Sequence, residues 1–321
     1  MLPFWISIAV LSVSQGVVVA LPRAWSQGWS ARVHSRAWAL VPPLSVIGFV
    51  AIGQVAERDS AQALTYIALV GVPLGAALAL GWLMRGARPW LALLVAPLFA
   101  LAWADRGGLA GDGAALALSA LSCVALGTLI GGVTPARWLA LGIVAMACAD
   151  AALVISDLLQ APNNALNAAH PVGGLPQLQA EVFGSAVMGY GDLFVAGVFG
   201  GLLACLPAHA PQGAPLKAPA GRGDARMGAC ARIDAAVGGR SPQLTGALLA
   251  ALLAVAFDFL FFAVNELPAT VPVAGALVIV VGASRRRGVN LLAGGSRQTV
   301  ATVPSRLPAD AAAPAPVRAP R

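Results

Sequence analysis

The stretch MGYGDLFVAGVFGG, residues 188–201, places one ionisable side chain, Asp192, in an otherwise apolar segment. With its apolar flanks the segment reaches the roughly 20 residues that a helix needs to cross a bilayer, and its glycines allow neighbouring helices to pack closely. A carboxylate in hydrocarbon costs at least about 2.5–3.5 kcal/mol, even on the lenient insertion scales. The stretch therefore predicts a membrane-spanning helix that carries an acid for a functional reason.

The remainder of the chain has the same apolar character. Its 321 residues are 59% hydrophobic and 10% charged, and the mean hydropathy is +0.81, whereas soluble domains carry about 25% charged residues. No segment alternates apolar and polar residues over the length of a barrel strand. We therefore expect an all-α polytopic membrane protein.

Nine apolar runs predict nine transmembrane helices. They cover about residues 2–22, 38–56, 62–84, 89–104, 113–133, 138–160, 180–206, 243–264 and 267–283. Helices 1–5 form an N-terminal part, residues 1–137, and helices 6–9 a second part, residues 138–283. The Gly/Ala/Pro/Arg-rich loop at 207–242 is expected to be a flexible cytoplasmic linker, and the basic Ala/Pro-rich tail at 284–321 to be disordered.

The basic residues predict the orientation of these helices. All but Arg58 and Arg106 of the 20 Lys and Arg residues fall in the odd-numbered loops and the C-terminal tail. Under the positive-inside rule, a multi-pass protein of the cell membrane is expected, with its N-terminus outside and its C-terminus in the cytoplasm. The net charge of +7 is then a topology signal, with some contact to anionic lipid, and not a sign of nucleic-acid binding.

Four acids lie inside predicted spans: Asp150 and Asp157 in the sixth, Asp192 in the seventh and Asp258 in the eighth. Asp150 lies about thirteen residues into its helix and Asp192 about twelve into the next, so antiparallel packing brings both to a similar depth. Asp157 is the competing candidate, expected on the same helix face but nearer the outer surface. Asp258 is expected at the outer interface or in a pairing within the bundle.

Two carboxyl groups that share one proton suit the hydrolysis of a peptide bond. The ionised one takes a proton from water, while the protonated one polarises the scissile carbonyl. Gly189 and Gly191 leave the backbone beside Asp192 open to an extended peptide. The cysteines and histidines form no CxxC motif or Cys/His cluster, so we expect no metal and no cofactor.

These motifs resemble those of the GxGD intramembrane aspartyl proteases, the family of presenilin and signal peptide peptidase. GYGD at 189–192 is similar to the GxGD signature, with Tyr190 at the variable position, and GDLFVAGVFGGLLA resembles the apolar segment after this signature in signal peptide peptidases. ADAALV at 149–154 resembles the YD motif, which makes Asp150 the catalytic partner, although Ala149 stands where the family has tyrosine. The nine spans and the outer N-terminus also resemble signal peptide peptidase.

A third motif lies at the start of the ninth predicted helix. LPATVPVAG at 267–275 resembles the PAL motif, which in that family lies beside the catalytic pair. The matching residues, with a threonine in place of the leucine, are Leu267, Pro268, Ala269 and Thr270. The resemblance implies that this segment positions the substrate. We expect exposed backbone of the segment to pair with an unwound strand of the substrate.

The resemblance implies an aspartic endopeptidase that cuts membrane-spanning segments, including signal-peptide remnants, inside the lipid bilayer. Its expected partners are single-span substrates, and it is expected to act alone. Prepilin peptidases also use GxGD, but a lysine follows their motif, whereas Leu193 and Phe194 follow here. Two different functions compete with proteolysis: a proton- or cation-coupled transporter that uses Asp150, Asp157 and Asp192 as a relay, and a catalytically inactive family member.

Overall fold

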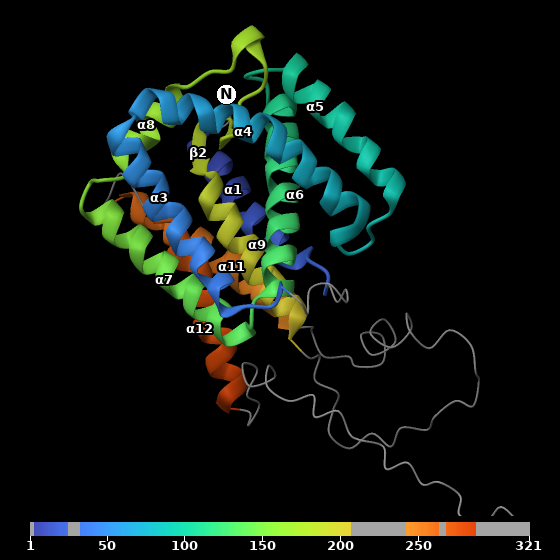
Figure 1. Ribbon diagram of the computed structural model, residues 1–321, viewed down its shortest axis with the longest axis vertical. Helices are drawn as coiled ribbons and strands as arrows, with labels where there is room; N and C mark the ends of the chain where they lie inside the picture. The colour runs from blue at the N-terminus through green and yellow to red at the C-terminus, as the bar shows by residue number, and fades with distance from the viewer. Residues whose placement is uncertain (1–2, 25–32, 207–241, 263–267, 287–321) are drawn as a thin grey trace, which may run out of the picture.

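The computed structural model describes residues 3–24, 33–206, 242–262 and 268–286, which are mostly helical (Figure 1). Four helical stretches are long and apolar enough to cross a membrane: Arg36–Val55, Asp59–Leu83, Leu109–Val133 and Ala136–Ile155. Shorter apolar helices occupy Phe4–Ala20, Pro89–Ala104, Tyr190–Cys205, Pro242–Asp258 and Thr270–Ser284. The chain is thus a largely α-helical membrane protein, while nine as the number of spans stays a prediction.

Each predicted span contains an α-helix. The α-helices are α1 (Phe4–Ala20), α3 (Val41–Val55), α4 (Glu57–Leu78), α5 (Val95–Ala104), α6 (Leu109–Val133), α7 (Ala136–Ile155), α8 (Gln160–Ala168), α9 (Tyr190–Cys205), α11 (Pro242–Asp258) and α12 (Thr270–Arg286). Short 3-10 or π turns are η1 (Arg36–Leu40), η2 (Ala79–Leu83), η3 (Pro89–Leu94), η4 (Val172–Gly174) and η5 (Phe259–Phe262). The predictions for the loop at 207–242 and the tail at 284–321 fall almost entirely outside the described residues.

The centre of the bundle is the contact between α6 and α9. A Cβ atom at Gly131 of α6 would come within 2.8 Å of the backbone of Gly201. Gly127 and Gly197 meet the facing backbone still more closely. These glycines are spaced four residues apart on each helix and so lie on one face, which lets the two backbones approach as small residues commonly allow in membranes. The candidate acid Asp192 is therefore carried on a helix whose backbone packs closely against that of α6.

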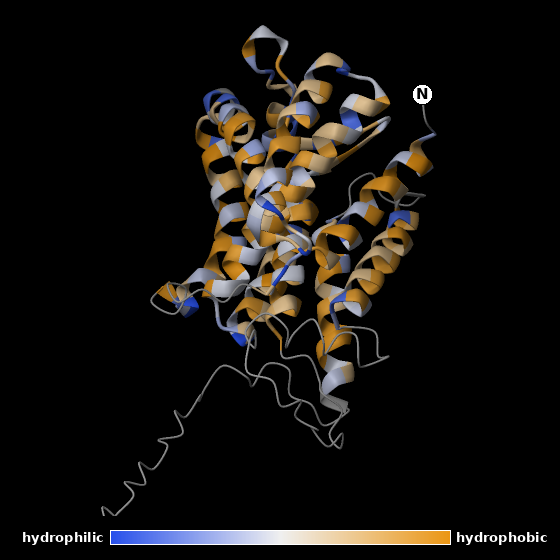
Figure 2. Cartoon of the chain, turned by 90° about the vertical axis from the view of Figure 1, so that its right-hand side faces the viewer, coloured by the Kyte–Doolittle hydropathy of each residue, from blue (hydrophilic) through white to orange (hydrophobic). Residues whose placement is uncertain are grey.

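Helix α1 packs against both α9 and α11. Its Gly16 lies against α11, because a Cβ atom there would be 2.7 Å from Cβ of Ala251. The buried side of α1 is also polar, since it carries Ser7, Ser12 and Gln15. On the outer surface, by contrast, α3 and α4 expose large apolar side chains such as Ile47, Ile67 and Val70, and Figure 2 shows hydrophobic residues over much of the bundle.

The seventh predicted span, 180–206, is wrong in its first part. Residues Ala180–Phe183 and Ala186–Gly189 form an antiparallel hairpin, β1 and β2, which turns at Gly184 with a φ of 60°. Helix α9 begins only at Tyr190. The all-α prediction therefore needs one correction, a small two-stranded sheet at the end of the bundle where the N-terminus lies (Figure 1).

The sixth predicted span, 138–160, extends too far. Helix α7 ends at Ile155, and Asp157 follows it with a φ of 61°, in the left-handed region that aspartate tolerates better than most residues. Asp157 is exposed. The expectation that Asp157 shares a helix face with Asp150 is therefore wrong, because the helix has already ended there.

Basic residues gather at the opposite end of the bundle from the hairpin. Backbone hydrogen bonds join Arg23 to Leu83 and Arg85 to Leu21, so these two connections lie side by side. The Arg85 guanidinium also donates to Gln243 at the start of α11. Arg36 and Arg137 belong to the same end, since Ser35 bonds to Val133 just before α7 begins. This distribution agrees with the pattern that the loops predict.

Candidate functional site

Asp192 lies in the first turn of α9, directly after the hairpin. Its Oδ2 accepts a hydrogen bond of 3.2 Å from the backbone N–H of Gly189, the residue that caps the helix. A carboxylate that satisfies a free N–H at a helix start is a familiar stabilising arrangement. The expectation that Asp192 lies about twelve residues into its helix is wrong, because the hairpin takes the place of the first turns.

Asp150 lies on α7, one turn before its end, and is buried, with 7% of its surface exposed. Its Oδ2 accepts a hydrogen bond of 2.6 Å from the hydroxyl of Thr270, the first residue of α12. This aspartate is therefore fixed by a residue 120 positions later in the chain.

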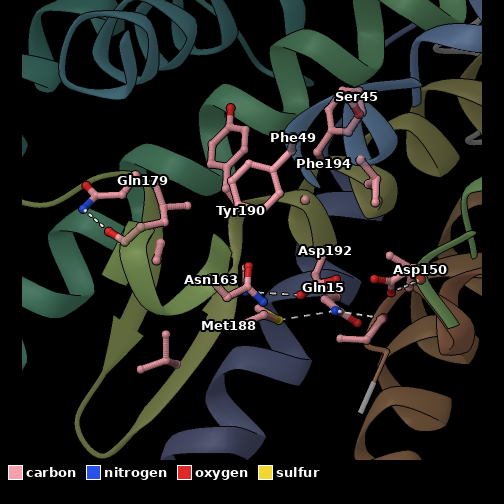
Figure 3. A pocket seen from close by; sticks show the side chains of 18 of the residues that line it. Gln15, Ser45, Phe49, Asp150, Asn163, Gln179, Met188, Tyr190, Asp192 and Phe194 are labelled. Atoms are coloured by element: carbon pink, nitrogen blue, oxygen red, sulfur yellow. Dashed lines mark hydrogen bonds between the residues drawn. The ribbon is translucent and has the colours of Figure 1, made fainter. Parts of the chain in front are cut away.

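The fold brings Asp150 and Asp192 together at one cavity, where both side chains form part of the wall (Figure 3). The two carboxyl groups interact electrostatically. Met146, one turn before Asp150, reaches the motif as well, because a Cβ atom at Gly191 would lie 3.9 Å from its Cε. Two acids from different helices therefore meet as the sequence predicts, while their catalytic role stays a prediction.

Gly189 and Tyr190 of the GxGD motif make different structural contacts. Gly189 ends β2 and caps α9. The phenol of Tyr190 shares a hydrogen bond of 2.8 Å with the hydroxyl of Ser122 on α6. This bond, together with the glycine contacts between α6 and α9, fixes the start of α9 and thereby the position of Asp192.

The PAL-like segment reaches the same cavity. Ala269, Thr270 and Pro272 line it, whereas Leu267 lies outside the described residues. Pro268 and Ala269 precede α12 and are half-buried. The carbonyl of Ala269 accepts a hydrogen bond of 3.4 Å from the Gln15 amide of α1. Sequence reasoning missed Gln15, although an amide inside an otherwise apolar helix is a signal that could have found it.

The cavity has a volume of about 810 Å³ and extends from the two aspartates to α3 and α4. Its lining is mostly apolar, and among the described residues that form it there is no Lys, Arg or His. Amide side chains from several elements also line it: Gln15, Asn163, Asn164, Asn167 and Gln179. Apolar walls with a few polar groups are typical of a binding cavity, and here the polar groups are acids, amides and hydroxyls.

Of the two remaining acids in predicted spans, one lines the same cavity and the other does not. Asp258, the last residue of α11, lines the cavity and accepts a hydrogen bond of 2.6 Å from Ser12 of α1. This hydrogen bond is a pairing of Asp258 within the bundle, which was one of the two expectations for this residue. Asp157 is exposed beyond the end of α7.

No group of three or more His, Cys, Asp and Glu side chains is positioned to hold a metal ion within the described part of the chain. Cys123 is buried, Cys148 and Cys205 are exposed, and Cys230 lies outside the described residues. Neither the known protein families nor the curated proteins nor the solved structures contain a match to this chain. The functional argument therefore rests on the geometry of the cavity.

Proposed function

We propose that this protein is an intramembrane aspartyl protease that hydrolyses peptide bonds within membrane-spanning segments. The observation that carries the proposal is the meeting of Asp150 and Asp192, from two different helices, at one largely apolar cavity. Such acids are rare in membranes and usually serve a function. Their arrangement supports the resemblance to the GxGD proteases drawn from the sequence.

In the proposed reaction, one carboxylate of the pair takes a proton from the attacking water. The other carboxyl, which is protonated, polarises the carbonyl of the scissile bond, and the proton that the first carboxylate took from water then passes to the leaving amine. The Thr270 hydroxyl and the Gly189 N–H each hold one oxygen of one acid. The proposed reaction requires the second oxygen of each acid to meet water or substrate.

The hairpin offers a route by which the substrate reaches the pair. Strand β2 pairs with β1 along one edge, and Val187, Met188 and Gly189 of β2 line the cavity. Val187 is 52% exposed. Because a helical substrate has no free amides to offer, it must unwind locally, and an extended peptide added to β2 would pass directly beside Asp192.

The proposed setting is the cell membrane, with the N-terminus outside. The gathering of Arg23, Arg36, Arg85 and Arg137 at one end of the bundle supports this orientation. The substrates proposed are single-span proteins and signal-peptide remnants. The absence of a basic residue from the described cavity lining favours apolar segments over acidic ones.

The test is cleavage of a model single-span substrate by purified protein in bilayers. D150N and D192N should each lower the rate by about 100-fold or more, because each removes one partner of the acid–base pair. D157N is the matched control, since Asp157 lies on the same segment but is exposed outside the cavity. If the parent protein cleaves nothing and instead drives proton-coupled uptake that needs the same acids, a transporter function replaces the proposal.

A further inference from the structure

Gln15 lies inside α1, and the proposed reaction does not use it. Its side chain lines the same cavity as Asp150 and Asp192 (Figure 3), and 1% of its surface is exposed. Its Oε1 has no hydrogen-bonding partner among the described residues. A buried polar atom without a partner lowers the stability of a folded protein. Stability alone therefore does not explain an amide at this position.

The amide nitrogen of Gln15 contacts two segments that are far apart in the chain. It donates to Sδ of Met188 on β2 over 3.4 Å, and to the carbonyl oxygen of Ala269, just before α12, also over 3.4 Å. Because both partners are acceptors, the nitrogen and not the oxygen of the amide faces them. Gln15 therefore bridges the hairpin and the PAL-like segment.

Each bridged segment also holds one of the two candidate acids. The residue after Met188 donates its backbone N–H to Asp192. The residue after Ala269 donates its hydroxyl to Asp150. The Gln15 amide is thus one residue away from the hydrogen-bond donor of each acid, and the spacing of the two carboxyl groups depends on the bridge that it makes.

Helix α1 is a firm support for this bridge, because it packs closely against two other helices. A Cβ atom at Gly16, the residue after Gln15, would lie 2.7 Å from Cβ of Ala251 on α11. A Cβ atom at Gly200 of α9 would lie 2.5 Å from the carbonyl oxygen of Val19. A side chain that is held by packing in this way can fix the geometry of a site.

We propose that Gln15 is a positioning residue of the candidate site, whose amide sets the spacing of Asp150 and Asp192 by joining β2 to the PAL-like segment. This inference rests on the proposed proteolytic function for its effect on the rate. A misplacement of about 1 Å can cost about 100-fold in an enzyme reaction. The bridge itself is a feature of the folded protein and is measurable without any substrate.

The first experiment measures the cleavage kinetics of Q15M. Methionine is similar to glutamine in length but has no N–H donor, so both acids remain while the bridge is lost. We expect kcat for a single-span substrate to fall about 10- to 100-fold, and KM to stay within about twofold of the parent. Q54M is the matched control, because the exposed Gln54 of α3 also donates to a backbone carbonyl over 3.4 Å but does not line the cavity.

Q54M should leave both constants unchanged. A Q15M protein with the kcat of the parent would overturn the proposal. A higher KM with an unchanged kcat would overturn it as well, because Gln15 would then bind the substrate and not position the acids.

Thermal unfolding in detergent distinguishes positioning from a role in folding. Methionine removes the oxygen that has no partner, and the thioether of Met188 is only a weak acceptor. Q15M should therefore unfold at a temperature no lower than that of the parent. Q15L, which also lacks a donor, repeats the test with a branched side chain. If turnover is lost only together with a fall in the unfolding temperature in both variants, Gln15 serves folding and the proposal fails.

The last experiment needs no substrate. In a cysteine-free background, spin labels are attached at V187C on β2 and V278C on α12, where the native side chains are 52% and 60% exposed. Addition of Q15M should broaden the distribution of distances between the two labels, while Q54M should not. Equal widths with and without Q15M contradict the bridge. A broader distribution in a protein whose parent form cleaves no substrate supports the bridge and counts against the proteolytic function alone.

Discussion

At the scale of the residue, Thr270 is the most informative position. The PAL-like segment has threonine where the resemblance leads one to expect leucine, and its hydroxyl donates a hydrogen bond of 2.6 Å to Asp150. A leucine side chain has no donor to offer there. The difference in sequence therefore corresponds to a specific contact, which holds one candidate acid in place.

T270V should lower the rate of cleavage by about 10- to 100-fold. Valine keeps the shape but removes the donor, and a hydrogen bond to a charged group contributes about 1.5–3 kcal/mol, where about 1.4 kcal/mol is a factor of ten in rate. The measurement is the turnover of a single-span substrate at saturation. T270S, which retains the hydroxyl, is the control and should stay close to the parent. Equal rates for T270V and the parent would mean that this bond has no part in the reaction.

The candidate acids themselves were predictable from the sequence, because ionisable residues stand out in apolar segments. Their partners were not. Thr270 and Ser12 donate hydrogen bonds to acids that lie on other elements, and only the packing of distant segments determines such pairs. Asp157 was misplaced for a local reason, since a left-handed residue after the helix redirects the chain.

At the scale of the element, the glycine faces of α6 and α9 determine where the site lies. Gly197 and Gly201 of α9 lie against the backbone around Cys123 and Gly127 of α6. The sequence predicted close packing from its glycines, but not which pairs of helices meet. The pairing follows from matching spacing on two helices that are far apart in the chain.

G201A should lower the free energy of unfolding by about 1–3 kcal/mol, the typical cost of overpacking. Even a single methyl group at this position would meet the Gly127 carbonyl. G48A is the matched control, because a Cβ atom at Gly48 of α3 has no described atom within 4 Å, and it should leave stability unchanged or slightly higher. Thermal unfolding in detergent measures both variants. A G201A protein as stable as the parent would show that α6 and α9 can separate without loss.

The hairpin is the element that sequence reasoning missed. Its strands are short and continue without interruption into the apolar run of α9, so a search for long apolar segments joined them into one span. The one signal in the sequence was Gly184 between the strands. Burial alternates along β2 in the structure, but its residues are all apolar or small, so their types do not alternate in the sequence.

At the scale of the whole molecule, the two ends of the bundle differ in charge, and this predicts the orientation. In a cysteine-free background, A168C on α8 should react with a membrane-impermeant maleimide added to intact cells. A87C, between η2 and η3 at the basic end, should react only after the cells are opened. The reason is that basic connections stay in the cytoplasm. The opposite labelling pattern would invert the topology.

The polar side of α1 also has a consequence for biosynthesis. Ser12 bonds to Asp258 and Gln15 to Ala269, residues that are 246 and 254 positions later. A ribosome that adds about 5–20 residues per second needs on the order of 10 to 50 s to cover that distance. During this delay α1 lies in the translocon or the lipid, and Ser12 and Gln15 lack these two partners. We expect nascent α1 to be retained beside the insertion machinery until α11 and α12 have been made, so that a helix made before its partners packs only after them.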